Sequence, residues 1–174
     1  MKKRDQGEEP HGAAARGPSA AFLLAQVGAH AAQKFGERLS GLNLAPAHAG
    51  ILRILGRTPA ITQQALADAL GMVASRLVAL IDELEERGLA ERRENAEDRR
   101  RYALHLTAQG RSTLEAIGRV AREHQQALLK SLSSDEQQLL ALLLERVAAD
   151  QGLVRGVHPG YARLGMPPEG RENP

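Results

Sequence analysis

Hydrophobic residues recur every three or four positions through most of the chain, which is the spacing of one face of an α-helix. The first such stretch covers residues 19–42, and the second covers residues 47–55 after Pro46, a residue that fits the first turn of a helix. Shorter stretches follow at residues 63–70 and 73–87. The pattern therefore predicts four helices in the first part of the chain.

Residues that favour helix ends separate the third and fourth of these helices. Thr62 is placed to cap the start of the third helix, and Gly71 follows its last residue. Gly88 ends the fourth helix at the position where glycine is usual. Two helices joined by so short a glycine-containing turn predict a helix-turn-helix.

The hydrophobic period changes after the fourth helix. Every second residue in 101–106 is a larger apolar one, namely Tyr102, Leu104 and Leu106, as in a strand with one face toward a core. Together with residues 89–94, this segment predicts a two-stranded hairpin, the wing of a winged helix-turn-helix.

Helical spacing returns after the hairpin. Thr107 is placed to cap a helix that reaches Lys130, and Ser133 with Glu136 forms a capping-box pattern for a last helix through Asp150. The predicted fold class is therefore mainly α, with a small two-stranded β wing.

Both ends of the chain lack a hydrophobic period. Residues 1–18 mix charged residues with glycine and proline, and residues 151–174 are rich in glycine and proline, so both are predicted to be disordered tails. One domain over residues 19–150 is expected between them.

Composition removes several classes of function. The absence of cysteine excludes disulfide frameworks, cysteine zinc sites and thiol nucleophiles. No motif typical of catalysis is present, so we expect neither an enzyme nor a cofactor. The longest apolar runs, such as residues 139–144, are far below the roughly 18 residues of a membrane span, and no signal peptide is evident. A cytoplasmic protein without a membrane partner is expected.

Charge points to a local nucleic-acid surface and not to a global one. The 23 basic residues nearly balance the 21 acidic ones, for a net charge of +2. The predicted hairpin, in contrast, carries five arginines within ERRENAEDRRRY. Alternating charges over a solvated turn are one interpretation. Their position directly after a helix-turn-helix favours the other, insertion of arginine into a DNA minor groove.

The fourth helix adds a constraint on docking. Burial of Leu77, Leu80, Ile81 and Leu84 turns its opposite side outward. Acidic residues follow from Asp82 onward and would be repelled by phosphates, so only the first turns are expected to enter the major groove.

The segment with LADALG, LEERGL, EDRR and LTxxG resembles the multiple antibiotic resistance regulator (MarR) family of winged helix-turn-helix proteins. The resemblance covers residues 19–150. It implies a DNA-binding core at residues 46–106 and dimerisation helices at residues 19–42, 107–130 and 133–150. It further implies a homodimeric, ligand-responsive repressor on double-stranded DNA, associated with the nucleoid when bound.

The resemblance also implies which residues contact DNA. The recognition-helix positions are Val73, Ala74, Ser75, Arg76, Val78 and Ala79. The wing positions are Arg93, Asp98, Arg99, Arg100 and Arg101. Because most of the helix positions are apolar here, hydrogen-bond readout of bases rests on Ser75 and Arg76. A helical dimer with weak DNA specificity, serving as a small-molecule or protein-binding module, stays open as the alternative.

The resemblance finally implies an effector cleft between the dimerisation helices and the winged domain, for a small molecule such as an aromatic anion. Candidate contacts are Phe22, His30, His48, Arg53 and Arg57, for each of which core packing or phosphate binding is the plainer interpretation. The histidines lack the spacing of metal ligands, so no metal site is expected.

Overall fold

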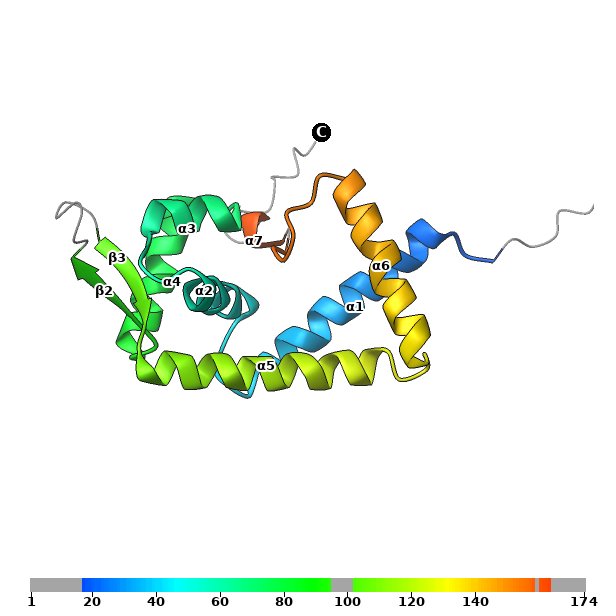
Figure 1. Ribbon diagram of the computed structural model, residues 1–174, viewed down its shortest axis with the longest axis horizontal. Helices are drawn as coiled ribbons and strands as arrows, with labels where there is room; N and C mark the ends of the chain where they lie inside the picture. Colours follow the sequence, from blue (N-terminus) through cyan, green and yellow to red (C-terminus); the bar gives the residue numbers. More distant parts are fainter. Residues whose placement is uncertain (1–16, 95–101, 159, 164–174) are drawn as a thin grey trace, which may run out of the picture.

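The computed structural model describes residues 17–94, 102–158 and 160–163. It is mainly helical with one small sheet, so the predicted fold class is confirmed (Figure 1). The helices are α1 Ala20–Ser40, α2 Pro46–Arg57, α3 Gln63–Leu70, α4 Ala74–Glu86, α5 Ala108–Leu128, α6 Ser134–Asp150 and α7 Gly160–Arg163. The strands are β1 Ile61–Thr62, β2 Ala90–Glu94 and β3 Tyr102–Leu106.

The sheet is antiparallel in the order β1-β3-β2, so it has one strand more than the sequence predicted. The extra strand, β1, pairs Ile61 with Leu104 and is only two residues long, too short for its period to be visible. Tyr102 was expected on the inner face, but 57% of it is exposed, because it pairs with Glu94 at the far end of the hairpin, beyond the core.

The core joins α2, α3 and α4 to the sheet. Its fully buried large side chains include Leu52 of α2, Leu66 of α3, Leu77 of α4 and Leu104 of β3. Burying side chains of this size stabilises a fold by about 1.5–3 kcal/mol each. The helix-turn-helix and the hairpin are therefore one packed unit.

The LTxxG segment fixes the joint between the hairpin and α5. Thr107 donates its hydroxyl to the carbonyl of Gly88 at 2.6 Å and accepts from the Gly110 N–H at 2.9 Å, which caps α5 as predicted. A Cβ atom on Gly110 would lie 1.9 Å from the Leu89 carbonyl oxygen. Only glycine therefore permits this close approach of helix and strand.

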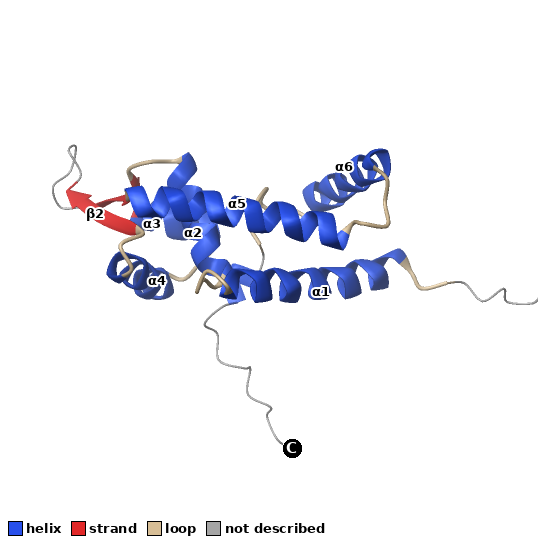
Figure 2. Ribbon diagram, turned by 90° about the horizontal axis from the view of Figure 1, so that it is seen from below, coloured by secondary structure: helices blue, strands red, loops and turns tan. Residues whose placement is uncertain are grey.

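The long helices extend beyond this packed unit, to which α1 contributes Leu39 and α5 contributes Ile117. α1 and α5 run side by side, and α6 lies on another side of α5 (Figure 2). No residue of α6 is buried. The apolar side chains exposed on α6 are Leu139, Leu142, Leu143, Leu144 and Val147, and those on α1 are Phe22, Leu23, Leu24 and Val27.

The C-terminal segment corrects the sequence analysis. We expected a disordered tail after residue 150, but the described part of this segment turns back from α6 and ends in α7, near α2 (Figure 1). Tyr161 is buried in the main core, with 8% of its surface exposed. A composition rich in glycine and proline concealed a long-range contact. The predicted N-terminal tail, apart from residues 17 and 18, lies outside the described residues.

Among the described residues, no single helix has the length and hydropathy of a membrane span. The pair α3 and α4 meets these criteria jointly, but the two helices are bent by 112° to each other.

Candidate nucleic-acid interface and ligand cavity

The first turns of α4 form an exposed surface that contains all the recognition-helix positions predicted from the sequence. The four apolar residues from Leu77 to Leu84 are buried as expected, which turns the opposite side outward. Val73 is 64% exposed and Val78 is 36% exposed. No acidic residue lies in the first turn, so the N-terminal N–H groups and the helix dipole favour an anion there. The exposed positions are Val73, Ala74, Ser75, Arg76, Val78 and Ala79.

The acidic second half of α4 has a structural use that sequence reasoning missed. Arg92 of β2 lies 2.7 Å from the Asp82 carboxylate and also forms an ion pair with Glu85. The Arg92 backbone N–H donates to Glu85 at 2.7 Å. The sequence predicts these acids only as charges that repel phosphates. Asp82 and Glu85 instead attach the recognition helix to the hairpin, and their charge is partly neutralised by Arg92.

Two further contacts fix α4 to the N-terminal half of the core. Arg87 donates to the carbonyls of Asn43 at 2.8 Å and Leu42 at 3.2 Å, in the loop between α1 and α2. Backbone carbonyls are present at every residue, so no sequence signal identified them as the acceptors. The orientation of the recognition helix is thus tied directly to the end of α1.

His48 makes the second of these contacts and is buried, with 6% of its surface exposed. Its Nδ1 accepts from the Ala45 N–H at 3.1 Å, so the proton lies on Nε2, which donates to Glu83 at 3.0 Å. Burial lowers the pKa of His48 below its usual value, and Glu83 partly opposes this shift. His48 therefore packs in the core and links α2 to α4, which agrees with the plainer of the two interpretations given for this residue.

The wing is described only in part. Arg93 of β2 is exposed and lies 2.5 Å from Glu91 on the same strand. The hairpin extends beyond the helices at one end of the molecule (Figure 1). The predicted contacts Asp98, Arg99, Arg100 and Arg101 lie outside the described residues.

A cavity of about 500 Å³ lies between α1, α2, α4 and the C-terminal segment. Apolar side chains such as Phe35 and Leu80 line most of it, and Arg53 and Arg76 supply positive charge. Tyr161 forms part of the opposite wall. Arg76 is notable because it belongs both to this wall and to the exposed start of the recognition helix.

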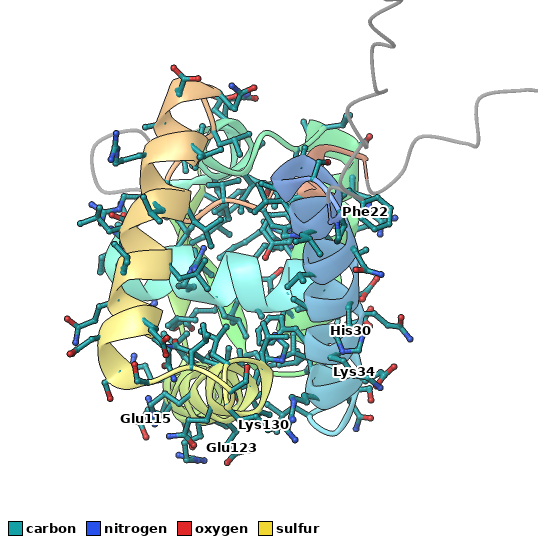
Figure 3. All side chains as sticks on the ribbon, turned by 90° about the vertical axis from the view of Figure 1, so that its right-hand side faces the viewer. Phe22, His30, Lys34, Glu115, Glu123 and Lys130 are labelled. Carbon is teal, nitrogen blue, oxygen red and sulfur yellow. The ribbon has the colours of Figure 1, made fainter. Side chains whose placement is uncertain are left out.

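Of the predicted effector contacts, only Arg53 lies in this cavity. Phe22 points outward near the start of α1, and His30 and Lys34 lie further along that helix, closer to α5 (Figure 3). His30 lines a separate pocket of about 160 Å³ with His124. Arg57 is exposed at the last residue of α2 and does not line the cavity. The structure thus brings only Arg53 of this set to the cavity wall, because helical spacing does not show which helix packs against which. Among the described residues, no three histidine or carboxylate side chains are placed to hold a metal ion.

Comparison with known proteins identifies this arrangement. A family model described as the MarR family matches residues 40–101. A putative transcriptional regulatory protein for the hcr operon of Thauera aromatica is 36% identical over 98 residues, which are 56% of this chain and 59% of that protein. The transcriptional regulator HosA of Escherichia coli O127:H6 is 31% identical over 97 residues, which are 56% of this chain and 72% of HosA.

A solved structure extends the similarity to most of the chain. The transcriptional repressor CouR, bound to a 23-mer DNA duplex, superposes with a TM-score of 0.67 at 30% identity. The superposition covers 75% of this chain and 92% of CouR. These relatives are transcriptional regulators and not enzymes, in agreement with the predicted class. With the exposed start of α4, the hairpin beside it and the shared fold, the comparisons show that this chain is a DNA-binding transcriptional regulator that belongs to the MarR family.

Proposed function

We propose that the protein is a homodimeric, ligand-responsive repressor that binds a pseudo-palindromic promoter site. One observation carries the dimer: α6 buries no residue of its own, yet exposes five large apolar side chains. A patch of this kind marks a protein contact. Pairing with the exposed face of α1 in a second copy would cover both sets of side chains. A symmetric dimer then presents two recognition helices to half-sites about one helical turn apart.

Specific DNA contact is assigned to Ser75 and Arg76 in the major groove, with the wing arginines in the flanking minor groove. Arginine is the usual bidentate reader of guanine, and arginine is also attracted to a narrow minor groove. CouR, which has the same fold, is bound to a DNA duplex in its solved structure, and this supports DNA binding by the present chain. A bound dimer of this kind would block access of RNA polymerase to an overlapping promoter.

The ligand response is assigned to the 500 Å³ cavity. Its aromatic and apolar walls suit a ring, and Arg53 and Arg76 suit a carboxylate or phenolate, so the effector class is an aromatic anion. An anion that engages Arg76 from the cavity side competes with the DNA for the same guanidinium group. Binding of ligand and binding of DNA are then mutually unfavourable, as a repressor that releases its operator requires.

Gel-shift titration against the protein's own upstream region tests the DNA assignment. Arg76→Ala should cost about 1–3 kcal/mol of binding at one base position, and Arg100→Ala should weaken binding to all sequences and lower the salt slope by about one. Arg119→Ala on α5 is the matched control. Unchanged affinity and salt slope for Arg100→Ala would show that the wing assignment is wrong.

A second candidate function follows from the exposed valines Val73 and Val78 at positions expected to contact bases. These side chains form no hydrogen bonds, so the protein would bind DNA with little sequence preference and act mainly as a small-molecule or protein-binding module. Competition distinguishes the two. Binding to the upstream region that survives excess random duplex supports the specific repressor, and equal loss to any duplex supports the second candidate.

A further inference from the structure

The described part of the C-terminal segment, residues 152–158 and 160–163, is here called the strap. It leaves the end of α6, where Arg155 lies 2.8 Å from Glu145, and reaches α2 (Figure 1). Gly152 and Gly156 have φ values of +66° and +76°, which glycine adopts without strain. The strap thus has the turns that it needs to double back onto the winged domain.

The strap ends in a specific seat for Tyr161. Its ring packs on Gly50 in the middle of α2, where an added Cβ atom would lie 2.9 Å from Cε2 of the ring. A glycine at this place in a buried helix leaves room for the ring and for little else. The His158 ring lies beside it, with the ring centroids 5.7 Å apart and the ring planes tilted by 50°. Burial raises the pKa of the Tyr161 hydroxyl, so the phenol stays neutral there.

The same seat closes the cavity. Val157, His158 and Tyr161 of the strap face a wall that includes Arg53 and Arg76. The protein therefore places a phenol of its own beside the arginines that we assign to an aromatic anion.

We propose that Tyr161 and the strap are a displaceable wall of the effector cavity, which an aromatic anion moves aside when it engages Arg53 and Arg76. The inference rests on the proposed function, because it takes the cavity to be the effector site. The ligand then binds only when the strap is displaced. The measured ligand affinity is therefore lower than the affinity of the form with the strap displaced. The strap connects α6, in the proposed dimerisation region, with the cavity wall that contains Arg76. Displacement of the strap therefore releases this link between the two regions.

Such a contact is suited to opening. Among the described residues of the strap, Tyr161 is buried and Val157 packs partly buried against the core. Segments with so few buried contacts open at low free-energy cost. If the form with the strap displaced makes up about one tenth of the free protein, removal of the Tyr161 ring raises the ligand affinity by about tenfold.

Two substitutions on different elements test the proposal in the full-length protein. Tyr161→Ala removes the ring, and Gly50→Ala fills its seat while favouring the helix. Titration with benzoate in a calorimeter should give about tenfold tighter binding for both variants than for the unaltered protein. Tyr102→Ala, at the exposed tyrosine of β3, is the matched control and should bind benzoate as the unaltered protein does.

Each other result has a distinct meaning. Equal or weaker binding in both variants, or tighter binding in only one, overturns the displacement and leaves the cavity as an effector site with Tyr161 as a fixed wall. Binding of benzoate to none of the proteins overturns the effector site and the strap proposal together. Loss of binding in Arg53→Gln confirms that the titration reports this cavity.

Displacement has a direct optical readout as well. The chain contains two tyrosines and no tryptophan, so in a Tyr102→Phe variant the emission comes from Tyr161 alone. Acrylamide should quench this emission weakly in the free protein and strongly at saturating benzoate. Quenching that stays weak at saturation would show that the ligand binds beside the seated strap, and would overturn the proposal.

Discussion

The winged unit and the long peripheral helices differ in how much of their apolar surface a single chain buries. α2, α3, α4 and the sheet share a continuous core in which side chains such as Leu52, Leu77 and Leu104 have no exposed surface. α6 has no buried residue and displays a row of leucines. One chain is therefore sufficient to build the DNA-reading half. The other half has the surface composition of an interface, in agreement with the proposed dimer.

Truncation in the core should have the largest effect. Leu77→Ala should lower the free energy of unfolding by about 2–5 kcal/mol, because it leaves a cavity between α4 and its neighbours. Denaturant titration followed by circular dichroism measures this change. Val73→Ala, just before the same helix and exposed, should stay within about 0.5 kcal/mol. Similar losses for both would remove the distinction between buried and exposed faces of α4.

Charged residues placed on the exposed apolar face of α6 should weaken self-association of the protein without unfolding it. The double variant Leu139→Glu and Leu143→Glu should weaken self-association by about 100-fold or more, since an interface that buries these side chains would have to bury charge. Light scattering during size-exclusion chromatography measures the effect. Gln138→Glu adds a charge without removing a leucine and is the control. A monomeric unaltered protein at micromolar concentration would contradict the dimer outright.

The two neighbouring arginines of β2 should have opposite phenotypes. Arg92→Ala removes the ion pairs with Asp82 and Glu85 and should cost about 1 kcal/mol of stability. Arg93→Ala should leave stability unchanged and lower the salt slope of DNA binding by about one, because Arg93 is exposed on the proposed wing surface. Thermal melts and gel shifts at several salt concentrations give both quantities. A stability loss in Arg93→Ala with none in Arg92→Ala would reverse the assignment.

The smallest effect concerns pH. The pKa of His48 is lowered in the folded protein, so below about pH 6.5 the unfolded state takes up a proton before the folded state does. Stability from neutral His48 is therefore present at higher pH and decreases as the pH falls from about 6.5. When the pH is lowered from 7.5 to 5.5, the melting temperature of His48→Gln should fall by less than that of the unaltered protein. The lowered pKa of His124 acts in the same direction, so His124→Gln is the comparison variant.

Local signals predicted the helices well. Thr62, Thr107 and Ser133 were expected as N-caps, and each side chain accepts the backbone hydrogen bond that a cap requires. Caps and helical periods depend on residues three or four positions apart, so one sequence contains them. The buried face of α4 was predicted for the same reason.

Long-range contacts were not predictable in this way. Arg92 occurs in a run of charged residues, and nothing in that run distinguishes it from Arg93 or shows that its partners lie on α4. Tyr161 lies between proline and glycine residues that suggested disorder, and its partner Gly50 is more than a hundred positions away. The predicted effector contacts are distributed over α1 and α2, and only Arg53 lines the cavity.

The close contact of Gly110 with the Leu89 carbonyl makes α5 a lever arm. The contact leaves little freedom at the joint between hairpin and helix, while the other end of α5 lies among the peripheral helices. With 21 residues at about 1.5 Å each, the helix is about 30 Å long, so a tilt of about 5° displaces one end by about 2.6 Å relative to the other. A minor groove is only about 6 Å wide. In the proposed dimer, a small rotation between protomers, too slight to disturb their packing, would be amplified into a displacement that takes a wing arginine out of register with its groove.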